Sequence, residues 1–219
     1  MADPNRQHWN RQFKILQDTW PKPVNFEECI KICTELHAMV HSAAMSDAGV
    51  WSFEDELWGK MSEEVFRKVH REDQSIAWKL WHAARIEDIT MNMLIAGEPQ
   101  IAHTGGWIGR MGIAVRDTGN AMNEEEIGAL SLSLGMQTLK DYRLAVGRRT
   151  RDIILALEAE DLKRKIEPPR LQKIADEGAV AEGAAWLVDY WGKKTFAGLL
   201  LMPATRHNLV HLNESMRLL

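Results

Sequence analysis

Three histidines that lie far apart in the sequence have the spacing of a metal site. His207 and His211 are four residues apart in one stretch with helical spacing of apolar residues, and His82 lies in another such stretch. Residues four apart on a helix leave the same face, about 6 Å apart along the axis, so both rings can reach one ion. A third imidazole from a neighbouring helix would complete a three-nitrogen site with open positions for water or substrate. We therefore predict a metal site formed by His82, His207 and His211.

Two carboxylates and one further histidine are candidates for roles beside these ligands. Glu87 and Glu214 follow His82 and His211 closely along their helices, near enough to orient a ring or to hold a water molecule. The alternative for both is a solvated helix face. His41, close to the end of its own helix, is a candidate for the lining of the cavity that holds the metal, and the alternative is an ordinary polar contact.

A second histidine pair, His37 and His41, continues a run at the same spacing that begins with Cys29 and Cys33. These are the ligand types of a zinc finger. Over the length of the run, however, a helix rises about 18 Å and the stripe rotates by about 120°, so one ion cannot touch all four side chains. We interpret the two cysteines as small core residues, since a disulfide between them would close almost no loop. Whether this second pair contributes to the metal site stays open.

Tryptophan is frequent, with nine residues in the chain, and several precede the predicted ligands. Trp78 and Trp81 come directly before His82, and Trp186 and Trp191 come before the C-terminal histidine pair. Large aromatic side chains commonly wall small-molecule pockets, so some of these four are expected beside the metal, with Trp81 as a pocket candidate. For most of the nine, packing in the core is the expected role.

Composition limits the class of protein. The chain has 219 residues, enough for one good-sized core, and we expect a single domain. Its formal charge of -4 is spread along the sequence without a basic block, which argues against nucleic acid as a partner. No apolar run approaches the roughly 18 residues of a membrane span, and the first ten residues are too polar for a secretory signal. We expect a cytoplasmic protein with no membrane partner.

The elements that must position these residues are helices, because apolar positions recur at helical spacing and strict alternation is absent. The predicted fold class is all-α, with the long amphipathic helices forming a bundle. Pro21 and Pro23 should end a first helix, Gly97 should end the helix that carries His82, and Pro203 should kink the last one. Short helices are expected from Ser62, from Asn123 and near 170–177. A first amphipathic piece is expected over residues 6–20, and the four long helices over residues 25–46, 74–96, 136–160 and 180–217.

Two segments depart from a simple bundle. A loop containing Trp51, Phe53 and Trp58 is expected after the helix at 25–46. Residues 97–122 hold six glycines, the first of them Gly97, and are interpreted as an excursion outside the bundle that could act as a lid. We expect one domain over 1–219, with 1–22 as an N-terminal helical extension and 97–122 as a loop insertion.

Two segments of the chain resemble the DinB (YfiT-like) superfamily. They run from Ile76 to Glu87, IAWKLWHAARIE, and from Leu201 to His211, LMPATRHNLVH. The resemblance in helix order covers roughly residues 25–217, but only these two segments are specific. It implies a four-helix bundle, often dimeric, in which a divalent metal is held by one histidine of the second bundle helix and an HxxxH pair of the last. The corresponding residues here are His82, His207 and His211.

The resemblance also implies chemistry, since relatives include mycothiol-dependent maleylpyruvate isomerase and bacillithiol transferases. A metal such as Zn²⁺ or Ni²⁺ would bind and acidify a low-molecular-weight thiol, and the thiolate is the nucleophile. The expected function is a metal-dependent enzyme that activates a small thiol or water, a thiol transferase or a hydrolase, in a homodimer that accepts a small-molecule substrate. The alternative is a non-catalytic, dimerising helical scaffold with structural histidines. The 97–122 insertion and the extra N-terminal helix are departures from the family pattern, so the thiol and the acceptor cannot be transferred from relatives.

Overall fold

The structure is a computed structural model that describes residues 3–20, 25–70 and 74–219. Across these ranges the chain forms α-helices, short 3-10 turns and two π-helical segments, and extended backbone pairs only at an isolated bridge between Lys165 and Thr195. The predicted all-α class is confirmed. In the same ranges, no helix combines the length and the apolar character that crossing a membrane requires.

The helical elements follow one another along the chain with short connections. The α-helices are α1 Pro4–Thr19, α2 Phe26–Met39, α3 Phe53–Lys60, α4 Glu63–Arg67, α5 Ile76–Asp88, α6 Ile101–Thr104, α7 Trp107–Arg110, α8 Glu124–Ser133, α9 Met136–Leu155, α10 Pro168–Asp176, α11 Trp186–Gly192, α12 Phe196–Leu199 and α13 His207–Met216. The 3-10 turns are η1 Ala43–Met45, η3 Asp161–Lys163 and η4 Glu182–Ala184, and the π-helices are η2 Ile89–Ala96 and η5 Leu200–Arg206.

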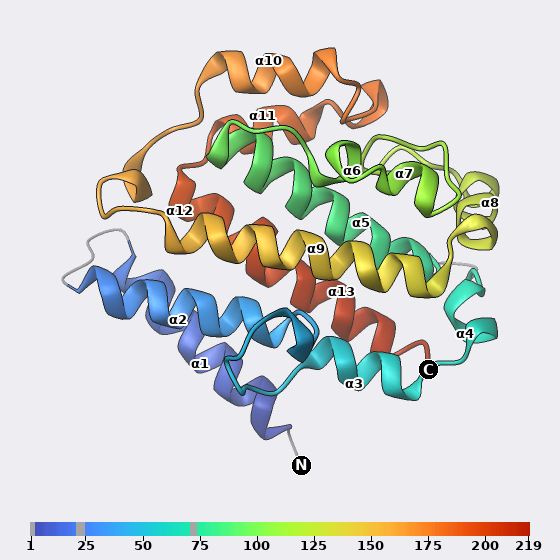
Figure 1. Cartoon of the computed structure of the whole chain (residues 1–219), viewed down its shortest axis with the longest axis horizontal. Coiled ribbons are helices and arrows are strands. Elements are labelled where there is room, and N and C mark those ends of the chain that lie inside the picture. The colour runs from blue at the N-terminus through green and yellow to red at the C-terminus, as the bar shows by residue number, and fades with distance from the viewer. Residues whose placement is uncertain (1–2, 21–24, 71–73) are drawn as a thin grey trace.

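Four long helical segments pack side by side around the core (Figure 1). α2 lies against α9 and η5, α9 lies against α5, and α5 lies against α13, so each segment has two neighbours within the set. α1 packs along α2, α3 contacts α13, and α10 covers η2 (Figure 1). The segments that carry His82 and the pair His207 and His211 are therefore direct neighbours.

α5 is the central helix, since each of its residues is buried. It begins at Ser75, whose hydroxyl accepts a hydrogen bond from the Trp78 amide at 2.9 Å. The helical path continues through η2 and ends at Gly97, which adopts the left-handed conformation with φ of 76° that glycine favours. The predicted stop at Gly97 is confirmed. A charged residue on such a helix has to be paired, because an unpaired buried charge costs several kcal/mol.

The last segment differs from the predicted kinked helix over 180–217. The chain instead forms α11 and α12 and then the π-helix η5, which contains Pro203 and leads directly into α13. Proline lacks a backbone donor, and the widened turn relieves the crowding that its ring would cause in an α-helix. The Thr205 hydroxyl donates to the carbonyls of Leu200 and Leu201 at 3.0 and 2.8 Å, which satisfies acceptors in this turn. π-helical turns are frequent at functional sites, and this one precedes His207.

The prediction of a loop around Trp51, Phe53 and Trp58 was wrong, because Phe53–Lys60 is helix α3. The Ser52 hydroxyl accepts a hydrogen bond from the Asp55 amide at 2.9 Å, and three acidic residues occupy the first turn. Both features stabilise the start of a helix, and the aromatic residues do not prevent it. The capped starts predicted after Ser62 and Asn123 are confirmed at α4 and α8.

Other boundaries differ by smaller amounts. α1 ends at Thr19, and Pro21 and Pro23 lie outside the described residues. α2 ends at Met39 and η1 continues the expected segment to Met45, and α9 ends at Leu155 rather than at residue 160. The helix expected near 170–177 is α10, which begins at Pro168. The glycine-rich segment 97–122 contains the short helices α6 and α7.

Candidate metal centre

The structure brings the rings of His82, His207 and His211 together. One ring nitrogen of each lies within 4.8 Å of those of the other two. The ring centroids of His82 are 5.1 Å from those of both other histidines, and the Nε2 atoms of His207 and His211 are 3.1 Å apart. Nitrogens bound to one tetrahedral Zn²⁺ are about 3.3 Å apart, so the pair on α13 already has the separation of two ligands of one ion.

The carbonyl of Thr118 fixes which nitrogen of His82 faces this centre. His82 Nδ1 lies 2.6 Å from that oxygen, which can only accept, so Nδ1 carries the proton and Nε2 carries a free lone pair. The indole of Trp78 stacks on the same ring, with centroids 4.5 Å apart and an angle of 7° between the planes. The turn that supplies Thr118 depends on Gly119, because a side-chain carbon at that position would come within 2.6 Å of the Trp81 ring. His82 is thus held in one orientation and one tautomer.

Glu214 performs the same task for His211. The Nδ1 atom of His211 donates to Glu214 Oε2 at 3.0 Å, which leaves the Nε2 lone pair free. The same oxygen accepts from Lys79 Nζ at 3.2 Å. The hydrogen bond from His211 lowers the pKa of Glu214 to about 2, and Lys79 adds to the effect. A carboxylate behind a ligating imidazole is the usual arrangement in metal sites, so the structure gives Glu214 the orienting position predicted for it.

Burial keeps the rings of His82 and His207 neutral. Desolvation, with the neighbouring His211 as the second cause, lowers the pKa of His82 to about 3. Desolvation and then His211 and His82 lower the pKa of His207 well below its usual value. Two facing nitrogens that both carry lone pairs repel, so either a proton on one of them or a cation has to lie between His207 and His211. Three imidazoles form the donor set for which Zn²⁺, Ni²⁺ and related ions compete.

The cavity beside this centre has a volume of about 180 Å³ and is bordered by His82 and His207. It opens between α11, η5 and the start of the segment that follows Gly119. A larger depression of about 730 Å³ lies between Gly112–Asp117 and α8, but its lining contains no histidine or cysteine. The small cavity is therefore the one that a ligand of the histidine centre would occupy. Its other lining residues are Ile86, Asn120, Trp186, Leu187, Tyr190, Trp191, Met202 and Pro203.

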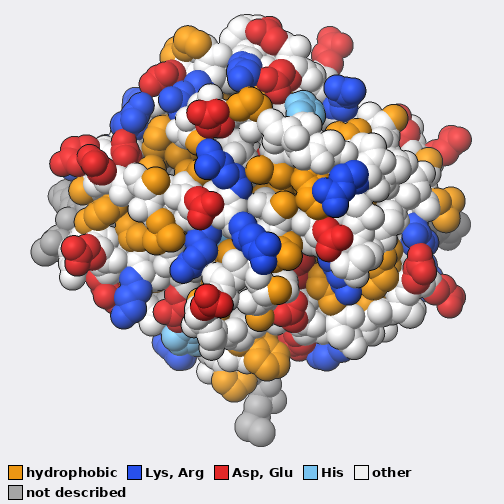
Figure 2. Space-filling view, in the orientation of Figure 1, with side chains coloured by type: hydrophobic (Ala, Val, Ile, Leu, Met, Phe, Trp, Pro, Cys, Tyr) orange, Lys and Arg blue, Asp and Glu red, His pale blue; other side chains and the backbone are white. Residues whose placement is uncertain are grey.

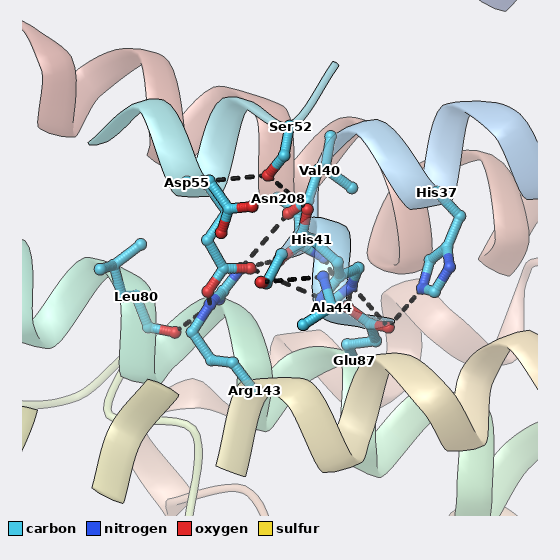
Figure 3. Close-up of polar contacts among 12 residues, drawn as sticks. His37, Val40, His41, Ala44, Ser52, Asp55, Leu80, Glu87, Arg143 and Asn208 are labelled. Atoms are coloured by element: carbon cyan, nitrogen blue, oxygen red, sulfur yellow. Dashed lines mark hydrogen bonds and ion pairs between the residues drawn. The ribbon is translucent and has the colours of Figure 1, made fainter. Parts of the chain in front are cut away.

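A second group is formed by His37, His41 and Glu87, whose ligand atoms also lie within 4.8 Å of one another. His37 Nε2 and His41 Nε2 lie 2.9 and 3.0 Å from oxygens of Glu87, and the Asn208 amide donates to the same carboxylate at 2.7 Å (Figure 3). Burial alone would raise the pKa of Glu87, but the charge of His41 and the hydrogen bonds of both rings hold the pKa well below its usual value. Two histidine groups in the described chain can thus hold a cation.

The second group continues into a buried ion pair. His41 Nδ1 lies 3.8 Å from Glu54 Oε2, and Arg143 donates to Glu54 from Nε at 2.7 Å and from Nη2 at 3.2 Å (Figure 3). Arg143 also donates to the carbonyl of Leu80 at 2.9 Å. The carboxylates of this network already accept hydrogen bonds from protein donors. His37, His41 and Glu87 do not border the cavity of the first centre. Of the two histidine groups, only the one formed by His82, His207 and His211 therefore has a cavity beside it that could hold a ligand.

The remaining predicted site residues are placed as follows. His41 lies in the second group and not in the cavity lining, and Glu87 accepts from His37, His41 and Asn208 rather than from a predicted ligand. Trp81 is fully buried and packs against the turn at Gly119, whereas Trp186 and Trp191 line the cavity. The contacts made by Thr118 and Asn208 were not predicted from the sequence. A backbone carbonyl has no sequence signal, but Asn208 directly follows His207 and could have been found.

Neither a family model nor a curated protein matches the chain.

Charged side chains do not gather by sign on the face shown in Figure 2, where acidic and basic groups alternate with apolar ones.

Proposed function

We propose that the chain is a DinB-like metalloprotein that binds a divalent cation, with Zn²⁺ or Ni²⁺ as the leading ions, through Nε2 of His82, His207 and His211. The observation that carries this proposal is the anchoring of two of the rings: Thr118 and Glu214 accept from Nδ1 and leave the Nε2 lone pairs directed at one place. The pairwise packing of α2, α9, α5 and α13 supports the bundle that the resemblance implies. Nitrogen ligands do not select one first-row metal, so the native ion has to be measured.

A bound cation of this kind supplies a Lewis acid that lowers the pKa of a small thiol or of water to near neutrality. The protein's own residues do the positioning. Thr118 and Glu214 hold the rings, Trp78 covers one face of His82, and the cavity bordered by His82 and His207 gives a ligand a place to lie. This arrangement supports a metal-dependent enzyme that activates a thiol for transfer, or water for hydrolysis. The homodimer that the resemblance implies belongs to the same proposal.

The first test is metal content and thermal unfolding of protein purified without an affinity tag. We expect about one equivalent of divalent metal per chain, a rise in melting temperature when Zn²⁺ or Ni²⁺ is added to chelator-treated protein, and the loss of both in His207→Ala. His8→Ala is the matched control, because His8 pairs with Glu35 and its side chain is 39% exposed. The proposal fails if neither ion changes the melting temperature of the parent and His207→Ala behaves like it.

A second candidate is a non-catalytic scaffold with structural histidines. The observation in its favour is the group of His37 and His41, where Glu87 already gives both rings a buried hydrogen-bond partner. A thiol-transfer assay with a low-molecular-weight thiol and electrophilic acceptors separates the two candidates. Turnover that depends on His82, absent from His82→Ala, supports the enzyme, and turnover no higher than that of the metal-free protein supports the scaffold.

A further inference from the structure

The cavity beside His82 and His207 has walls that carry no charge. Six of its lining residues are apolar or indole side chains from α5, α11 and η5: Ile86, Leu187, Met202, Pro203, Trp186 and Trp191. The polar groups in the wall are the Asn120 amide, the Tyr190 hydroxyl and the two imidazoles, none of which is a fixed ion. Away from the cation proposed at the histidines, a charged group on a ligand would lose its hydration against these walls at a cost of several kcal/mol, because no lining side chain supplies the opposite charge.

One charged group beside this wall is Lys194, which contacts the ring of Tyr190. Lys194 Nζ lies 4.4 Å from the centroid of the Tyr190 ring, but Lys194 is not among the residues that line the cavity. Its ammonium is therefore placed to stack on Tyr190 rather than to neutralise an anion next to the histidines. The lining therefore selects against ligands that carry a charge on the part lying away from the cation.

The volume sets the size of an acceptable ligand. An apolar cavity of about 150 Å³ holds one benzene molecule, so the 180 Å³ measured here accommodates one six-membered ring with one or two further heavy atoms. Trp186 borders this cavity and is 58% exposed, so its indole is accessible to a ligand that enters.

We propose, on the basis of the proposed metal function, that the ligand of this site is a small molecule with one metal-binding head and an uncharged, apolar, ring-sized body. The head lies between His82 and His207, and the body lies against Trp186, Trp191 and Leu187. A thiol with an aryl or a short alkyl body meets this description. A thiol that carries a carboxylate or a sulfonate does not.

The test uses protein loaded with Co²⁺, whose absorption changes when a thiolate binds. Phenylmethanethiol, 2-mercaptoethanol and 3-mercaptopropionate are titrated under the same conditions. We expect phenylmethanethiol to bind at least tenfold more tightly than 2-mercaptoethanol, because a phenyl group leaves water, and 3-mercaptopropionate to bind most weakly. Equal affinities, tighter binding of the carboxylate, or no thiol binding to the cobalt-loaded protein would each overturn the inference.

Two variants locate the preference. Trp186→Ala should weaken binding of phenylmethanethiol severalfold and leave 2-mercaptoethanol unchanged, and since Trp186 is exposed the protein should still fold. Leu155→Ala removes a comparably exposed apolar side chain from the end of α9 and should change neither affinity. Failure of the parent to take up Co²⁺ at the three histidines is a different result, which rejects the metal function itself.

Discussion

Asn208 donates a 2.7 Å hydrogen bond to Glu87, and in doing so it joins the two histidine groups of the protein. Asn208 is the residue after His207 on α13, and Glu87 lies on α5, five residues after His82. The same amide accepts from Arg143 at 3.3 Å through Oδ1, which fixes its orientation. The rotation of α13 relative to α5, and hence the distance between His82 and His207, is therefore set in part by a buried contact outside the candidate metal centre.

Loss of the Glu214 carboxylate should weaken metal binding without removing a ligand. Glu214 accepts from His211 Nδ1, and partners of this kind typically contribute 10- to 100-fold to metal affinity. We expect Glu214→Ala to lower the affinity for Zn²⁺ by about that factor, and Glu214→Gln to lower it less, since its amide oxygen still accepts. Competition with a chromophoric chelator measures both.

The control for this experiment is Glu167→Ala. Glu167 is 55% exposed at its side chain and pairs with arginines at the surface, so its removal should leave the metal affinity as it was. An affinity of Glu214→Ala equal to that of the parent would show that Glu214 does not orient a ligand.

Arg143 should be needed for stability, because it is the cation that neutralises the buried Glu54. Arg143→Met leaves that carboxylate unpaired, and we expect the free energy of unfolding to fall by about 3–5 kcal/mol in urea titrations. Replacement of both partners, in Arg143→Met with Glu54→Gln, should restore part of the loss. Arg148→Met on the same helix changes an exposed residue and should cost no more than about 0.5 kcal/mol. If the losses of stability in Arg143→Met and in Glu54→Gln simply add in the double variant, the two side chains are not paired.

Two glycines in helices should respond to alanine in opposite directions. At Gly147, a methyl group would lie 2.8 Å from Nδ1 of His41 and 3.1 Å from a side-chain carbon of Met45, so we expect Gly147→Ala to destabilise by about 1–3 kcal/mol. At Gly128 in α8 nothing lies within 4 Å, and alanine should stabilise by about 0.5–1 kcal/mol through its better helix propensity. Thermal unfolding of both variants gives the comparison, and a stabilised Gly147→Ala would show that His41 and Met45 do not lie so close to α9.

The sequence predicted best those features that depend on local periodicity or on a cap. The helical class, the stop at Gly97 and the capped starts at Ser62 and Asn123 all follow from rules that act over a few residues. The convergence of His82 with the C-terminal pair also followed, because the i,i+4 spacing and the resemblance to a known bundle place those rings on facing helices.

What the sequence did not predict depends on contacts between distant segments. Thr118 contributes a backbone oxygen, and any residue type could supply one. Glu54 and Arg143 are separated by 89 residues, and neither has a neighbour in the sequence that reveals the pair. The π-helix η5 keeps the same apolar composition as an α-helix, so its wider turn is not visible in the spacing.

The metal-free protein should lose stability as the pH falls below 6.5. Burial is the main cause that lowers the pKa of both His37 and His82, and it takes the pKa of His82 to about 3. In the unfolded chain both rings titrate near pH 6.5. Below pH 6.5 the unfolded state therefore binds protons that the folded state does not, and this continues down to about pH 3 for His82. The free energy of unfolding falls with pH by up to about 1.4 kcal/mol per unit for each ring.

Urea titrations of chelator-treated protein at pH 7 and pH 5 measure this effect. His82→Gln removes one of the buried histidines with a lowered pKa, so its loss of stability between the two pH values should be smaller than that of the parent by about 1–2 kcal/mol. His8→Gln, at an exposed ring paired with Glu35, should keep the parent's dependence. Since both variants remove one histidine, a difference between them can only come from the burial of His82. Identical pH dependence in His82→Gln and the parent would mean that the His82 ring is protonated, or in contact with water, in the folded protein.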